Sequence, residues 1–162
     1  MRESMEECRL KDLGENFGMA AAAPNLVAVC FQEKNPARGL LYHRYSREGV
    51  PFESILQMVK QVDRLCDDIG YPARSTNLRS LVRKHITRRK NYRKMEKVME
   101  SSELMEQEGT EGTFLVHVHF RQNATWQGQV TWVEKKHTGQ FRSALELVKL
   151  MDDALREGVE QQ

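Results

Sequence analysis

Apolar and polar residues alternate with a period of two between residues 114 and 120. Valine and phenylalanine fall on one face of this stretch and two histidines on the other, which is typical of a half-buried strand. After a short polar loop, residues 128–133 form a second predicted strand. The few residues between the two strands favour an antiparallel hairpin.

A helical spacing of apolar residues follows this hairpin, and an earlier part of the chain has the same stripe. The later stripe consists of Phe141, Ala144, Leu145, Val148, Met151 and Leu155, and the earlier one of Phe52, Ile55, Leu56, Val59, Val62 and Cys66. Pro51 would occupy the first turn of the earlier helix, and Gly70 with Pro72 would end it. Because each phenylalanine begins its stripe, we expect both rings to be buried at equivalent sites.

These two parts of the chain are related in sequence. Residues 27–63 align without a gap to residues 116–152 and share ten identities over 37 positions. The alignment predicts two pseudo-symmetric ββα repeats, at 26–69 and 115–158. An isolated hairpin is marginal in water, so the repeats should join in one four-stranded antiparallel sheet with both helices on one face. The expected fold class is therefore α+β.

Length and composition agree with one domain over residues 1–162, which begins with a short N-terminal segment at 1–24. Apolar residues make up 40% of the chain and charged residues 30%, as in globular proteins with a charged surface. No apolar run is long enough for a membrane span, and the acidic beginning lacks the apolar region of a secretory signal. The three cysteines do not follow a metal-binding spacing and suit a reducing compartment. We therefore expect a cytoplasmic protein.

The segment at 70–112, between the repeats, contains most of the charge asymmetry. Neither glycine nor proline occurs from residue 77 to 107, which predicts one long helix or two helices that break near Asn91. Residues 74–97 hold ten Lys or Arg and one Glu, a local charge of +9 in a chain of net charge +2. This asymmetry is the strongest functional signal in the sequence.

A basic helix of this kind is able to contact phosphates or an acidic protein. The candidate contact residues are Arg83, Lys84, Arg88, Arg89, Lys90, Arg93 and Lys94. The alternative is a solvated helix face that interacts with acidic surfaces of its own chain or of a partner. No zinc finger, helix-turn-helix spacing or paired stacking aromatics strengthen the nucleic-acid interpretation.

The second hairpin offers another candidate surface. Trp126 is expected to be exposed near the hairpin tip, where it would form a recognition edge with neighbouring polar residues. The edge consists of Arg121, Gln122, Asn123, Trp126, Gln127 and Arg142. The alternative is a tryptophan that only caps the end of the sheet.

Candidates for catalytic or metal chemistry are few. His117 and His119 project from one strand face and could bind a metal together with His43 or a carboxylate, although exposed strand histidines are commoner. Neither Cys30 nor Cys66 belongs to a nucleophile motif, and no glycine-rich loop resembles a phosphate cradle. The sequence therefore predicts no metal, no cofactor and no enzymatic activity.

The motifs FRQNATWQG at 120–128, TWVE at 131–134 and FRSALE at 141–146 resemble a segment shared by a group of small, uncharacterised bacterial proteins. The resemblance covers about the last 45 residues. It implies no activity and assigns no functional residue.

Two functions fit these observations. The first is a non-catalytic binding or adaptor protein that holds a nucleic acid or an acidic protein through the basic helix and the second hairpin. A second copy of the chain is a further candidate partner. The alternative is a sensor of a small anionic ligand, bound near the pseudo-twofold axis by Arg121, Arg142 and Lys149. Steep salt dependence would distinguish a contact with many phosphates from a single buried ligand.

Overall fold

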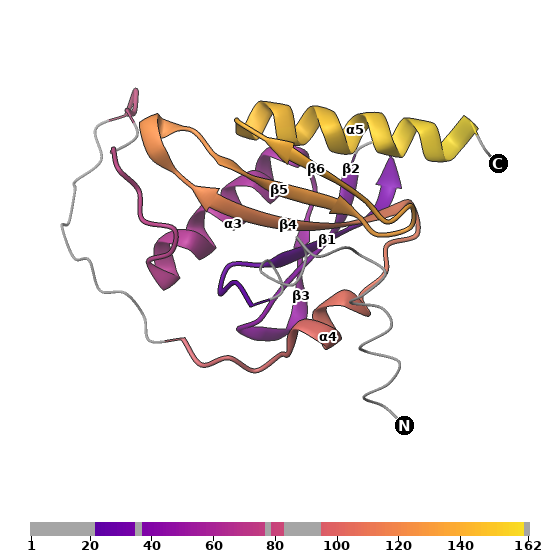
Figure 1. Cartoon of the computed structure of the whole chain (residues 1–162), viewed down its shortest axis with the longest axis horizontal. Coiled ribbons are helices and arrows are strands. Elements are labelled where there is room, and N and C mark those ends of the chain that lie inside the picture. The colour runs from indigo at the N-terminus through magenta and orange to yellow at the C-terminus, as the bar shows by residue number, and fades with distance from the viewer. Residues whose placement is uncertain (1–21, 35–36, 77–78, 83–94, 161–162) are drawn as a thin grey trace.

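The chain forms one six-stranded antiparallel sheet with helices packed against it (Figure 1). The structure is a computed structural model that describes residues 22–34, 37–76, 79–82 and 95–160. The first half supplies β1 (Val27–Lys34), β2 (Ala37–His43), β3 (Ser46–Phe52) and α3 (Ile55–Ile69). The second half supplies α4 (Ser101–Met105), β4 (Gly112–Phe120), the 3-10 turn η1 (Gln122–Ala124), β5 (Gln127–Trp132), β6 (His137–Phe141) and α5 (Ala144–Glu160). The predicted α+β class is confirmed.

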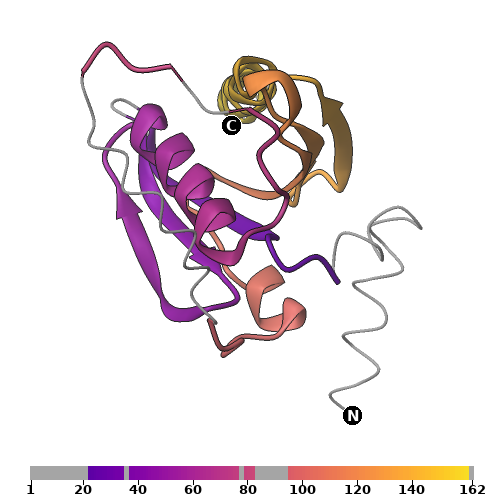
Figure 2. The same ribbon diagram turned by 90° about the vertical axis from the view of Figure 1, so that its left-hand side faces the viewer.

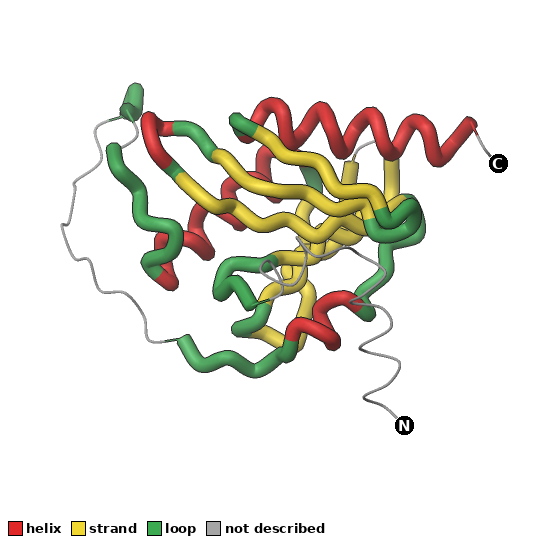
Figure 3. The backbone as a smooth tube through the Cα atoms, in the orientation of Figure 1, coloured by secondary structure: helices red, strands yellow, loops and turns green. Residues whose placement is uncertain are grey.

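The strands lie in the order β3-β2-β1-β4-β5-β6, so the two halves of the chain meet at the central pair β1 and β4 (Figure 3). Val27 pairs with Val116 across that junction. Outward from this junction the strands follow in chain order on both sides, as β1, β2 and β3 on one side and β4, β5 and β6 on the other. Each half contributes three strands and then a long helix, so the expectation of two strands in each half and a four-stranded sheet was wrong.

The additional strands, β3 and β6, lie at the two edges of the sheet. Pro51, which was expected in the first turn of a helix, lies instead on the edge strand β3. An edge strand tolerates proline, since one side of the strand makes no ladder hydrogen bonds. Each helix begins only after the serine that follows the strand.

Those serines cap the two long helices in the same way. Ser54 Oγ accepts a hydrogen bond from the Gln57 backbone N–H at 3.2 Å, and Ser143 Oγ accepts one from the Glu146 N–H at 3.0 Å. A serine at this position satisfies one of the donors that the first turn of a helix leaves unpaired. In the second helix, Glu146 also accepts from the backbone N–H of Arg142 at 2.7 Å. That hydrogen bond is the main reason why the pKa of Glu146 lies below its ordinary value.

The phenylalanine rings before these helices are buried, as predicted. Phe52 pairs with Gly39 on the neighbouring strand, and Phe141 pairs with Gly128. In both pairs a Cβ on the glycine would lie 2.8 Å from the tip of the ring. The same Cβ would lie 2.0 Å from the Cys30 carbonyl oxygen at Gly39 and 2.1 Å from the His117 carbonyl oxygen at Gly128, so the neighbouring strand and the ring together require glycine.

The core occupies the sheet face against which α3 and α5 pack. It contains Met58, Val62 and Leu65 of α3, Leu147, Met151 and Leu155 of α5, and the inward-facing residues of the strands. A smaller cluster on the other face includes Leu26, Cys30 and Leu115, and Met99 and Leu104 cover it. Figure 2 shows α4, which carries Leu104, well apart from α5.

The helical prediction for 70–112 fails in most of the described residues. Residues 79–82 and 95–100 are not helical, and α4 extends only from Ser101 to Met105. Leu81 and Val82 are exposed, so this segment has no core against which a helix could be stabilised. Residues 83–94 lie outside the described part of the chain. None of the described helices is both long and apolar enough to cross a membrane.

Candidate functional site

A cleft of about 360 Å³ lies between α3, the first turn of α5 and the connection from β4 to β5. Its size is at the lower end of the range for ligand pockets. The lining residues are Val59, Lys60, Asp63, Arg74, Arg121, Ala124, Thr125, Trp126, Ser143, Ala144 and Leu145.

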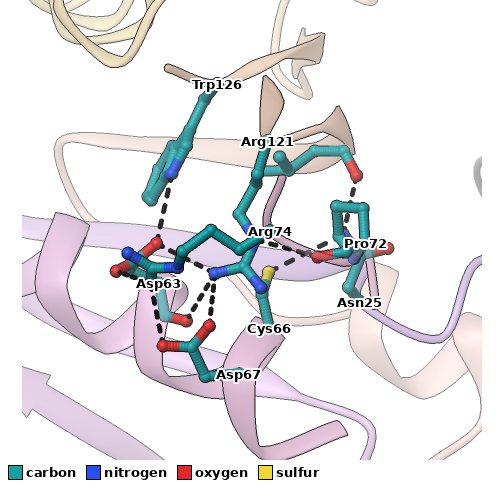
Figure 4. Close-up of polar contacts among 9 residues, drawn as sticks. Asn25, Asp63, Cys66, Asp67, Pro72, Arg74, Arg121 and Trp126 are labelled. Atoms are coloured by element: carbon teal, nitrogen blue, oxygen red, sulfur yellow. Dashed lines mark hydrogen bonds and ion pairs between the residues drawn. The ribbon is translucent and has the colours of Figure 1, made fainter. Parts of the chain in front are cut away.

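Arg121 joins the β4–β5 connection to α3 (Figure 4). Only 3% of its side chain is exposed, and Nη1 lies 3.1 Å from Asp63 Oδ1 and 2.7 Å from Asp67 Oδ1. Its Nε donates to the carbonyl oxygen of Pro72 at 2.9 Å. The guanidinium is therefore held by both the helix and the segment that follows it.

Arg74 completes the network from the other side of the two carboxylates. Its Nη2 lies 2.7 Å from Asp63 Oδ2 and 2.8 Å from Asp67 Oδ2. Burial alone would lower the pKa of Arg74, but the hydrogen bonds and charges of the two aspartates raise it above its ordinary value. Because the aspartates are four residues apart on α3, both point to the same side of the helix. Two cations and two anions neutralise one another here.

Trp126 forms one wall of the cleft and is tied to the same network. The indole is 6% exposed, and Nε1 donates to Asp63 Oδ1 at 3.3 Å. The prediction of an exposed tryptophan was therefore wrong. The turn before it brings the ring against α3, where Asp63 accepts the N–H that would otherwise be buried without a partner.

The turn that positions Trp126 has an unusual backbone. Asn123 and Ala124 have φ values of 54° and 57°, in the left-handed region that favours glycine. The Asn123 backbone N–H donates to Ser75 Oγ at 3.1 Å, and Thr125 Oγ1 donates to the Arg142 carbonyl at 3.4 Å. These contacts tie the turn to the segment after α3 and to the residue before the α5 cap.

The predicted recognition edge is thus divided. Arg121 and Trp126 are buried and line the cleft, whereas Gln122, Asn123 and Arg142 are exposed and Gln127 is half-buried. A register shift between Val118 and Phe120 interrupts the alternation at the end of β4. Phe120, expected on the core face, is consequently exposed.

The predicted basic contact residues Arg83, Lys84, Arg88, Arg89, Lys90, Arg93 and Lys94 all lie outside the described residues. Their role stays a prediction. Arg74, which belongs to the same basic stretch, pairs with Asp63 and Asp67 instead of facing solvent as a free charge.

The two strand histidines lie on the sheet face opposite the main core. The ring centroids of His117 and His119 are 4.3 Å apart, and burial, together with the charge of His119, lowers the pKa of His117 to about 4. Within the described ranges, no group of three or more His, Cys, Asp or Glu side chains could hold a metal ion.

The two described cysteine thiols are buried. Burial raises the pKa of Cys30 to about 12, with Glu134 and Glu108 adding to the shift. The pKa of Cys66 rises to about 11 for the same reason, although Arg121 opposes the shift. Both thiols are therefore protonated, and poor nucleophiles, at neutral pH.

Comparison of the chain with known proteins finds no relative. The chain matches no family model, no curated protein and no solved structure. The chemistry of the cleft therefore has to be interpreted from its own residues.

Sequence reasoning identified Arg121 and Trp126 but missed Asp63, Asp67, Arg74 and Lys60. Asp63 and Asp67 carried a usable signal, because their spacing places two carboxylates on one helix face. Their arginine partners lie 11 and 58 residues from Asp63. Only the folded chain brings these groups together.

Proposed function

We propose that this chain is a non-catalytic binding protein that holds a partner protein at the cleft between α3, α5 and the β4–β5 connection. The observation that carries the proposal is the combination of an apolar wall with charged groups that already neutralise each other. Val59, Ala144, Leu145 and Trp126 supply the wall. The Asp–Arg network makes the cleft a preformed shape, which lowers the ordering cost of binding.

Leu145 is the residue of the wall that most favours a macromolecular partner. It lines the cleft, yet 64% of its surface is exposed. Trp126 stands in the same wall, where its ring, only 6% exposed, fixes the shape of the surface beside Leu145. An exposed leucine beside a fixed tryptophan gives a partner apolar surface to bury.

We infer further that the two halves of the chain are pseudo-symmetric copies of one unit, each of three strands and a helix. The ungapped alignment, the matching serine caps and the Gly39–Phe52 and Gly128–Phe141 pairs support this inference. A crystal structure in which residues 27–69 and 116–158 fail to superpose would contradict it.

The copies differ where the cleft lies. The positions equivalent to Arg121 and Trp126 are Gln32 and Ala37 in the first half. Leu56, equivalent to Leu145, is 63% exposed but does not line the cleft. Leu56 therefore provides a matched control for Leu145.

The other candidate functions have less support. A small anion would compete with Asp63 and Asp67 for Arg121, while the Arg142 side chain is 89% exposed and pairs with Glu146 at 3.5 Å. A nucleic-acid partner is supported by the charge of residues 74–97 alone.

The test compares tagged full-length wild type with Leu145→Ser and Leu56→Ser in quantitative affinity purification from the source cells. Both changes remove an equally exposed leucine from equivalent helix positions. At least one protein should be captured in similar amounts by the wild type and by Leu56→Ser. The amount of that protein captured by Leu145→Ser should be lower by about tenfold or more, as for a residue at the centre of an interface. Calorimetry with that purified protein should reproduce the difference. If no captured protein distinguishes the two variants, the proposed function is wrong.

A further inference from the structure

The charge on the rim of the cleft indicates the chemistry of the partner. Lys60 is exposed and lines the cleft, and within the described residues it has no ion-pair partner. Asp63, Arg74 and Arg121 are engaged with one another and with Asp67. Lys60 is therefore the charged residue of the cleft lining that is left to pair with a ligand.

Resting on the function proposed above, we propose that the cleft holds an acidic segment of a partner protein. That segment places a large apolar side chain against Leu145 and the apolar wall of the cleft, and a nearby carboxylate at Lys60. An interface of this kind combines a desolvated apolar centre with a polar rim. The complementary charge at the rim favours the acidic partner and disfavours a basic one.

The dimensions of the site agree with a peptide segment. A cleft of about 360 Å³ lies at the small end of ligand pockets and suits one or two side chains. Single-stranded nucleic acids are held by bases that stack on exposed aromatic rings. The indole of Trp126 is only 6% exposed and its N–H is already used by Asp63, so little of the ring is open for a base to stack on.

The two halves of the chain again supply the control. Lys149 occupies the position equivalent to Lys60, is also exposed, and does not line the cleft. Replacing either lysine by glutamine removes one exposed positive charge, but only Lys60→Gln removes it from the site.

The experiment selects peptides from a random 12-residue display library on the immobilised full-length wild type. The enriched peptides should carry an aromatic residue, leucine or methionine within two residues of Asp or Glu. Their affinity, measured by calorimetry, should fall about tenfold in Leu145→Ser and about threefold to tenfold in Lys60→Gln, the range for a centre and a rim contact. It should stay within about twofold of the wild type in Leu56→Ser and Lys149→Gln.

Selection on Lys60→Glu should shift the enriched peptides from acidic to basic. If peptides depend on Leu145 but carry no acidic residue and tolerate Lys60→Gln, the acidic-partner inference is wrong and the binding function stands. If enriched peptides bind Leu145→Ser as well as the wild type, both proposals fail. Failure to enrich any peptide, or displacement of the peptides by a 20-nucleotide poly-dT strand, would also overturn the inference.

Discussion

Replacing Arg121 by methionine should destabilise the fold substantially, because the arginine joins two parts of the chain that are distant in sequence. Its guanidinium makes ion pairs with Asp63 and Asp67 and donates to the Pro72 carbonyl. Methionine retains part of the aliphatic volume but offers no donor. The change therefore removes one of the two cations that pair with Asp63 and Asp67, and it leaves the Pro72 carbonyl without its Arg121 donor.

Removing one member of a buried ion pair costs about 3–5 kcal/mol. The cost here should be smaller, because the Asp63 and Asp67 side chains are 24% and 49% exposed, so that water can replace part of the lost contact. Arg74 also remains on the other carboxylate oxygens. We expect a loss of about 2–3 kcal/mol in the free energy of unfolding.

Urea melts followed by circular dichroism and by tryptophan fluorescence would measure this loss, provided that both probes report the same transition. Arg142→Met is the matched control, since that side chain also pairs with a carboxylate but is 89% exposed. It should cost less than about 0.5 kcal/mol. In a double-mutant cycle with Asp63→Asn, the coupling energy should exceed about 1 kcal/mol. A loss below about 1 kcal/mol for Arg121→Met would show that the network does not join the elements as argued.

Further outcomes follow from the packing and the charges. Gly128→Ala should cost more than about 1 kcal/mol, because its Cβ would lie 2.1 Å from the His117 carbonyl oxygen and 2.8 Å from the Phe141 ring. Gly139→Ala, whose Cβ would meet its nearest neighbour at 3.9 Å, should change stability by less than about 0.5 kcal/mol, and equal effects of the two changes in urea melts would contradict this packing. Burial lowers the pKa of His117 from 6.5 to about 4, so the unfolded chain takes up the proton first as the pH falls. Stability should therefore decline from pH 6.5 to about pH 4 by at most about 3 kcal/mol, and a His117→Leu variant should not show that part of the decline. If the basic segment binds nucleic acid, replacing five of its residues by glutamine should weaken binding to every sequence about equally; these are Arg88, Arg89, Lys90, Arg93 and Lys94. The slope of log affinity against log salt concentration should fall by about one unit per lost phosphate contact. If the wild type shows no salt-sensitive binding near physiological ionic strength, that interpretation is wrong.

The regular parts of the fold could be predicted from the sequence, because their signals are local. Alternation marked β4, and apolar stripes marked α3 and α5, although Leu56 and Leu145 of those stripes are exposed. Phe52 and Phe141 are buried as expected, but at the ends of β3 and β6 and not on the helices. The third strand of each half could not be found in this way. β3 and β6 lie at the sheet edges, where few of their residues face the core, so they carry little apolar periodicity.

The sequence by itself determined which residues could be buried and which charges had to be accommodated, since both depend on residue type and local spacing. It could not determine that Arg121 is a buried ion-pair partner instead of an exposed recognition residue. That outcome depends on Asp63 and Asp67, which stand 58 and 54 residues away and reach Arg121 only after α3 packs on the sheet. The same packing brings the beginning of α5 beside Trp126 and creates the cleft. A binding site assembled from distant segments is thus decided by the tertiary structure, because no local pattern encodes the distance between its parts.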